Sequence, residues 1–312
     1  MTKITTYFDI IKKELGVNMD NYKIDELKLY IDKTEVIKIN EDLKIRLSKE
    51  LLKNYEEGLY DEGIENIVFA IDEIKKLNIK YPSNAKPVYY VYIVPDDNFV
   101  TLLNFPTRRA TKGGGKIVKC YDLDGFSSAY GVSSNIMLRQ NDANIMEKVN
   151  NIHEMSHMVH NMFYSKDRYL CEGFAEVLPL YILDYEQKFR QHRECILSLS
   201  EEDILTVQEL LDLEEKNEFV GSPFLPNTSC SFDKAYVSSY LFVRGCINVI
   251  EKKFKINKIE AMNKFLEIIM NSMYMHQFLV FDIAAALDVD KEDLLNGKFI
   301  QYKAITSVFN EK

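Results

Sequence analysis

The chain has 312 residues, of which 46% are hydrophobic and 28% are charged. This composition excludes an intrinsically disordered chain, and 12 Gly with 7 Pro exclude collagen-like and low-complexity classes. Asp and Glu outnumber Lys and Arg by 48 to 39, which gives a net charge of -9. Because a surface this acidic repels phosphate backbones, we expect no nucleic-acid partner.

Hydropathy and cysteine usage predict where the protein resides. No stretch approaches the roughly 18 uninterrupted apolar residues that a membrane span needs, so we expect no membrane association. The N-terminal segment has the pattern of an amphipathic helix and lacks the cleavage site of a secretory signal. The 5 Cys are scattered without a CxxC pair, which argues against a disulfide framework. These features together predict a cytoplasmic protein.

The elements of the first half change from helical to extended near residue 81. Apolar residues three and four apart among Lys and Glu predict helices over 41–55 and 61–77. The run KPVYYVYIV is typical of a strand, because β-branched and aromatic residues favour extended backbone. Further strands are predicted over 116–121 and 127–139, and the glycines at 113–115 predict a turn.

From residue 141 onward the pattern is helical almost to the end, with helices predicted over 142–163, 169–190, 201–213, 232–254 and 258–270. This order predicts a mostly helical α+β fold, with a small antiparallel sheet packed beside helix 142–163 and a C-terminal helical subdomain. We expect two domains: an N-terminal helical region of unknown role over 1–80, and a second domain over 81–312. The second domain divides into 81–163, with the strands and helix 142–163, and 164–312, which is helical.

One motif in helix 142–163 indicates chemistry. His153-Glu154-Met155-Ser156-His157 is an HExxH sequence, and two His four apart lie on one helical face, where both rings can reach one metal ion. Glu154 projects beside them, where it can take a proton from a water that the metal activates. With 5 His in 312 residues, roughly 0.01 such matches are expected by chance.

A third ligand is predicted from the next helix. A catalytic zinc commonly has three protein ligands and one open position. The helix 169–190 carries Glu172 and Glu176, which are four apart and therefore share a face. Either carboxylate can complete a site of two His and one Glu, with the other orienting a His ring.

HEMSH followed by CEGFAE resembles the gluzincin zinc metallopeptidases, the superfamily of thermolysin-like and aminopeptidase-like enzymes. In that family the third ligand is a Glu in a second helix, often within a phrase such as NEGFA, which matches Glu172. The 18 residues that separate His157 from Glu176 match the aminopeptidase branch instead. We favour Glu172, because loops change length more easily than ligands change neighbours. The resemblance then implies that Glu176 supports His153.

Two weaker matches extend the resemblance over roughly residues 87–270. The segment DKAYVSSYLFV resembles the family's helix in which a Tyr stabilises the oxyanion, and that position is Tyr236 here. The strand before the zinc helix corresponds to the edge strand that pairs with substrate backbone, which implies a peptide or protein substrate.

The resemblance therefore implies a gluzincin-like metallopeptidase domain over 81–312, with one zinc ion bound by His153, His157 and Glu172. Glu154 would act as general base and Tyr236 as oxyanion donor. Two alternatives stay open: an inactive descendant that serves as a binding or scaffold protein, and a zinc hydrolase acting on a non-peptide bond. Neither exo- nor endopeptidase action nor oligomeric state follows from the sequence.

Overall fold

The computed structural model describes residues 34–48, 52, 56–58, 61–81, 88–95, 114–122, 125–131, 151–153, 155–157, 159, 167–183, 196, 198–216, 218–219, 234–274 and 279–310. The chain forms two compact units. The sheet unit consists of Met1–Ile64 and Val88–Asp142, and the helical unit consists of Glu65–Pro87 and Ala143–Lys312.

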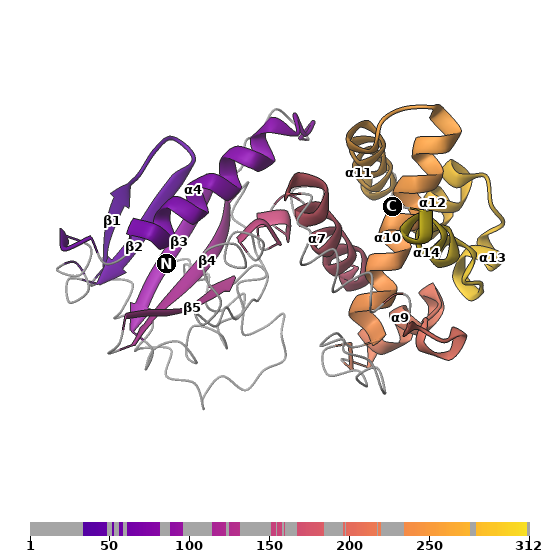
Figure 1. Cartoon of the computed structure of the whole chain (residues 1–312), viewed down its shortest axis with the longest axis horizontal. Coiled ribbons are helices and arrows are strands. Elements are labelled where there is room, and N and C mark those ends of the chain that lie inside the picture. The colour runs from indigo at the N-terminus through magenta and orange to yellow at the C-terminus, as the bar shows by residue number, and fades with distance from the viewer. Residues whose placement is uncertain are drawn as a thin grey trace, which may run out of the picture. The chain divides into compact units, whose positions relative to one another are not determined.

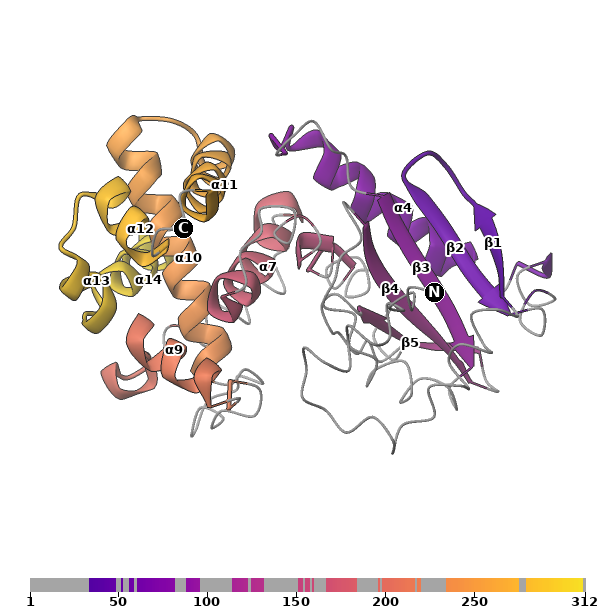
Figure 2. The same ribbon diagram turned by 180° about the vertical axis from the view of Figure 1, so that it is seen from behind.

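The described part of the sheet unit contains a five-stranded mixed sheet, with its strands in sequence order (Figures 1 and 2). Its strands are β1 (Thr34–Lys38), β2 (Leu43–Ser48), β3 (Val88–Pro95), β4 (Gly114–Asp122) and β5 (Gly125–Gly131). The two outer pairs, β1 with β2 and β4 with β5, are antiparallel. The two inner pairs, β2 with β3 and β3 with β4, are parallel.

The prediction of a small sheet is confirmed, but its antiparallel pairing holds only for the outer strands. Strand composition does not encode direction: parallel neighbours depend on the crossover segments between β2, β3 and β4. The predicted turn at 113–115 is wrong for Gly114 and Gly115, which lie in β4 and pair with Val88 and Tyr89.

The predicted helix over 41–55 is also wrong in its first half, because β2 occupies Leu43–Ser48; Leu52 is helical, and 49–51 and 53–55 lie outside the described residues. Leu43 and Ile45 are fully buried, which is the two-residue alternation of a strand. The turn before them is fixed by Asn40, whose Oδ1 accepts hydrogen bonds from the backbone N–H groups of Asp42 and Leu43. The charged residues around this short strand produced the apparent helical spacing.

Helices make up most of the described part of the helical unit, and α10 is central among them (Figure 1). It packs against α7, α9, α11, α12 and α14. The α-helices are α4, which begins in the sheet unit (Asp61–Lys76), α7 (Arg168–Leu183), α9 (Val207–Glu215), α10 (Lys234–Phe254), α11 (Lys258–Tyr274), α12 (Leu279–Leu287), α13 (Lys291–Asn296) and α14 (Phe299–Asn310). A 3-10 turn, η4, spans Glu201–Asp203.

Two glycines allow α10 to approach its neighbours closely. A Cβ atom on Gly173 of α7 would lie 2.3 Å from the backbone oxygen of Ser239 in α10. A Cβ on Gly245 of α10 would lie 2.1 Å from the backbone oxygen of Ile300 in α14. Since real Cβ atoms do not come so near a carbonyl, the absence of a side chain sets both helix separations.

The structure confirms the predicted helices over 61–77, 169–190, 201–213, 232–254 and 258–270 at the level of element type, as α4, α7, α9, α10 and α11. Helix α9 begins later than predicted, because Thr206 caps it by accepting a hydrogen bond from the N–H of Glu209. The described residues are thus mostly helical with a small sheet, as expected for α+β. Residues 1–33 lie outside the described residues, and the division at residue 80 stays a prediction. None of the described helices is long and apolar enough to cross a bilayer.

Candidate metal centre

The two histidines of the HExxH motif lie on a buried helical face. We call residues 151–153, 155–157 and 159 the histidine segment; all of these described residues are helical. Ile152, Met155 and Val159 are fully buried, which anchors the segment in the helical unit. His153 and His157 are 6% and 4% exposed, and their Nε2 atoms lie 3.2 Å apart.

Helix α7 supplies the carboxylates. Its start is fixed by Asp167, whose backbone oxygen accepts from the N–H groups of Leu170 and Cys171. The carboxylate of Glu214 in α9 accepts from the N–H of Arg168, so it also places negative charge at the positive end of α7.

Glu172 is the carboxylate that faces both histidines. Its Oε2 lies 3.3 Å from His157 Nε2 and 3.8 Å from His153 Nε2. Glu172 is 9% exposed, so the three donor groups meet in a site largely closed to solvent. The donor atoms of His153, His157 and Glu172 all lie within 4.8 Å of one another, and this group could hold a metal ion.

The spacing of these atoms fits a tetrahedral ion. With metal–ligand bonds of about 2.0–2.1 Å, two ligands of a tetrahedral zinc are separated by about 3.3 Å. The distances of 3.2 Å between the Nε2 atoms and 3.3 Å from His157 Nε2 to the carboxylate match this separation. The third distance, 3.8 Å from His153 Nε2 to Glu172 Oε2, exceeds it by about half an ångström, a change that a small side-chain rotation supplies.

Glu176 contacts the other side of the His153 ring. Its Oε1 lies 2.9 Å from His153 Nδ1, which is hydrogen-bonding distance for an Nδ1–H donor. With the proton on Nδ1, the lone pair of Nε2 is directed at the position where the metal would bind. Of the two carboxylates that the spacing left open, Glu172 therefore faces the donor cluster and Glu176 lies behind the first His.

Charge at the site keeps Glu172 ionised. Burial raises the pKa of its carboxyl, but the neighbouring His157, His153 and Arg168 outweigh burial, and the pKa lies below its ordinary value. An ionised carboxylate is the form that binds a cation. Burial raises the pKa of the adjacent Cys171 thiol well above its ordinary value, so Cys171 is a poor thiolate ligand.

Arg168 is a neighbour of the site that the sequence did not single out. Its Nε lies 3.6 Å from Glu172 Oε1, whereas the distances from Glu172 to the two histidines are to Oε2. The available signal was its position four residues before Glu172, which places the two side chains on one face of α7.

Tyr236, the predicted oxyanion donor, lies in the first turn of α10 and is partly buried. Its ring packs edge-to-face against Phe219, with centroids 5.7 Å apart. Phe219 in turn lies under the guanidinium of Arg168, at 5.5 Å from the ring centroid. Phe219 and Arg168 thus connect Tyr236 to Glu172, one of the three candidate metal ligands.

One predicted part of the site lies outside the described residues, and another lies partly outside them. The first is Glu154, the predicted general base, and its role stays a prediction from the motif. The predicted substrate strand is described only as far as Gly131; β5, the last strand in the order of the described sheet, covers its first part, and 132–140 lie outside.

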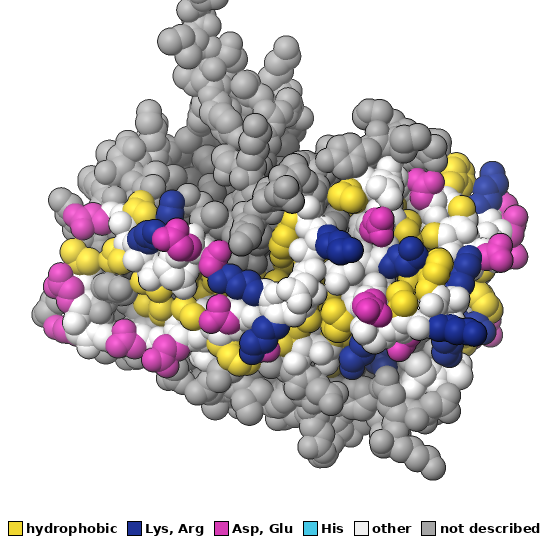
Figure 3. All heavy atoms as spheres, turned by 90° about the horizontal axis from the view of Figure 1, so that it is seen from above, with side chains coloured by type: hydrophobic (Ala, Val, Ile, Leu, Met, Phe, Trp, Pro, Cys, Tyr) yellow, Lys and Arg dark blue, Asp and Glu magenta, His cyan; other side chains and the backbone are white. Residues whose placement is uncertain are grey.

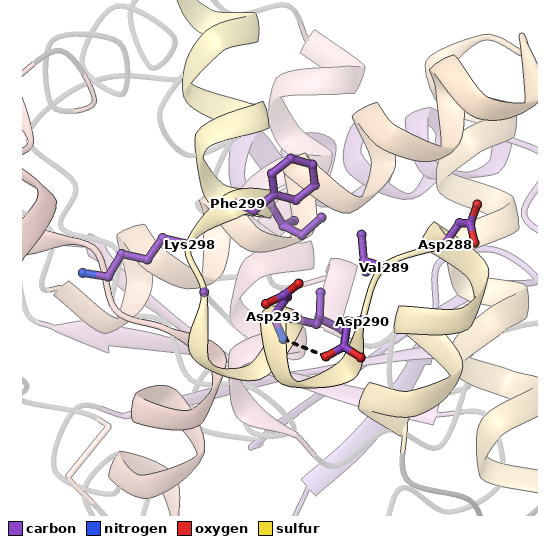
Figure 4. A pocket seen from close by; sticks show the side chains of 9 residues that line it. Asp288, Val289, Asp290, Asp293, Lys298 and Phe299 are labelled. Carbon is purple, nitrogen blue, oxygen red and sulfur yellow. Dashed lines mark hydrogen bonds between the residues drawn. The ribbon is translucent and has the colours of Figure 1, made fainter.

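A separate open pocket of roughly 430 Å³ lies among the residues between α12 and α13, α13 itself and the start of α14, and none of the three candidate metal ligands lines it (Figure 4). Asp290 at this pocket accepts from the N–H groups of Glu292 and Asp293, so it serves as the N-cap of α13. Figure 3 shows Lys and Arg interspersed with Asp and Glu over the described surface on one face, rather than a patch of one sign.

No protein-family model matches the chain, and no curated protein matches its sequence.

Proposed function

We propose that this protein is a zinc-dependent peptidase of gluzincin type. The observation that carries the proposal is the convergence of His153, His157 and Glu172, from two segments of the helical unit, on one buried point. The motif spacing and the EGFAE phrase support the family, and the distances among the donor atoms support a single ion.

The donor set favours zinc over other abundant divalent cations. Magnesium and calcium prefer six or more oxygen ligands, whereas two imidazole nitrogens and one carboxylate oxygen suit zinc. Three protein ligands leave one position of a tetrahedral ion for water or substrate, as in catalytic rather than structural zinc sites. Zinc bound there would supply Lewis-acid polarisation of a carbonyl and activation of a water molecule.

The chain's own residues would carry the proton transfers. Glu154, next to the first ligand in sequence, would accept the proton of the attacking water and then deliver it to the leaving amine. Glu176 would hold the His153 ring in the tautomer whose Nε2 carries no proton. Tyr236 would donate a hydrogen bond to the developing oxyanion.

The first test is metal content combined with cleavage. We expect about one zinc per chain in protein purified without chelator, and cleavage in a mixed peptide library that a chelator abolishes and zinc restores. Zinc without peptide cleavage would favour a hydrolase for another bond, and absence of any bound metal would favour the scaffold alternative.

The second test is the Glu154→Gln variant, which keeps the size of the side chain and removes the base. We expect bound zinc to be unchanged and cleavage to fall by a factor of about 100 or more, the range for loss of a general base. Peptide cleavage at the wild-type rate in this variant would refute the mechanism.

A further inference from the structure

The two oxygens of the Glu172 carboxylate have different partners. Oε2 faces the histidines, at 3.3 Å from His157 Nε2, whereas Oε1 lies 3.6 Å from Arg168 Nε. Arg168 and Glu172 are one helical turn apart in α7, so the guanidinium is held beside the carboxylate by the helix itself.

Arg168 is also fixed by two other segments of the helical unit. Its backbone N–H donates to Glu214 Oε2 in α9 at 2.9 Å. Its guanidinium lies over the ring of Phe219, which is only 1% exposed and is therefore a rigid support. The side chain of Arg168 is 38% exposed, yet these contacts restrict where its charge can lie.

The number of carboxylate oxygens that bind a metal decides whether a position stays open. A carboxylate that ligates through one oxygen leaves the fourth position of a three-ligand site available, whereas one that ligates through both oxygens fills it. A fixed guanidinium that attracts Oε1 competes with the metal for this oxygen.

We propose that Arg168 is a positioning residue that keeps Glu172 bound to the metal through Oε2 alone. The ring of Phe219, over which the guanidinium lies, holds Arg168 in place for this role. This inference rests on the proposed function only in requiring that the cluster binds a metal. It adds to that function the reason why a coordination position would stay open at this site.

The test uses the full chain loaded with cobalt(II), whose visible absorption is stronger in four-coordinate than in five- or six-coordinate sites. We expect Arg168→Gln to weaken this absorption relative to the wild type, because Oε1 becomes free to bind. We also expect zinc affinity, measured by chelator competition, to change by about tenfold or more, as is typical when the support of a ligand is removed. Arg168→Lys keeps the positive charge and should restore most of the wild-type spectrum.

The matched control is Lys258→Gln. Lys258 also places a cation over an aromatic ring, at 5.2 Å from the centroid of Tyr181 in α7, and it is exposed. Loss of this contact should leave both the cobalt spectrum and the zinc affinity unchanged. If Arg168→Gln folds poorly, Phe219→Leu is the second variant: it removes the aromatic ring beneath the guanidinium and keeps the charge of Arg168. It should weaken the cobalt absorption as Arg168→Gln does.

Two negative outcomes are distinguishable. If the wild type binds metal and Arg168→Gln has the wild-type spectrum and affinity, the role of Arg168 is refuted and the proposed peptidase is untouched. If the wild type binds neither cobalt nor zinc, both proposals fail.

Discussion

Replacement of Gly173 by Ala tests whether the packing of α7 on α10 holds the metal ligand in place. The added Cβ would lie 2.3 Å from the backbone oxygen of Ser239 and 2.6 Å from Val243 Cγ2. Ordinary contacts are about 3.4 Å or longer, so the two helices must separate by about 1 Å. Overpacking costs about 1–3 kcal/mol, and a contact with backbone favours the upper end. Since Gly→Ala within a helix contributes about 1 kcal/mol of stabilisation, we expect a net loss of about 1–2 kcal/mol.

The assay has two readouts and a matched control. Urea unfolding of metal-free protein gives the loss of stability, and chelator competition gives zinc affinity. Because Gly173 adjoins Glu172, the separation of α7 from α10 also moves a ligand, and we expect zinc affinity to fall by about tenfold or more. Gly245→Ala meets the oxygen of Ile300 at 2.1 Å between α10 and α14, so it should destabilise similarly without the loss of zinc affinity. Equal zinc affinities in Gly173→Ala and the wild type would refute this reasoning.

Three further predictions concern other residues of the helical unit. Glu176→Gln should leave zinc bound but weaken its affinity by about 10–100-fold in chelator competition, because the His153 ring loses its charged acceptor; an unchanged affinity would contradict the orienting role. Burial raises the pKa of Asp203, but hydrogen bonds from Ser200 outweigh it and hold the pKa below its ordinary value. The stabilisation by Asp203 is therefore full above its unfolded-state pKa and is lost as pH falls through the lower folded-state value, so the stability gap between wild type and Asp203→Asn should be large at pH 6 and close toward pH 3 in urea titrations. Burial raises the pKa of the Cys246 thiol well above its ordinary value, so peptide mapping should show alkylation of Cys246 only in denaturant; rapid labelling of folded protein would contradict this.

The residues that the sequence placed correctly are those governed by local periodicity. The spacing of four between His153 and His157, and between Glu172 and Glu176, identified side chains that share a helical face, and the structure brings His153, His157 and Glu172 together. Which Glu faces the pair depends on how α7 is rotated and shifted against the histidine segment. That rotation is set by tertiary contacts such as the one at Gly173, which spacing along one helix does not contain.

The sequence-based predictions were wrong or incomplete where an element or side chain is determined by contacts with residues that are distant along the chain. Strand β2 is a few residues long and is flanked by charged residues. Its alternation of apolar and polar residues was therefore too short to distinguish from the spacing of an amphipathic helix. The parallel pairing of β2 with β3 and of β3 with β4 was missed because strand direction follows from the path of the connecting chain. Arg168 was missed because its partners, Glu214 and Phe219, are distant in sequence.

The donors of the cluster come from two separate segments of the helical unit, and α7 is packed on the central helix α10. An ion held there would cross-link these two segments. Because the three ligands come together only in the folded chain, metal binding and folding would be thermodynamically linked. At a free metal concentration of 100 times the dissociation constant, this linkage adds about 2.7 kcal/mol to the free energy of unfolding. The melting temperature of the chain would thus serve as a gauge of metal occupancy that needs no substrate.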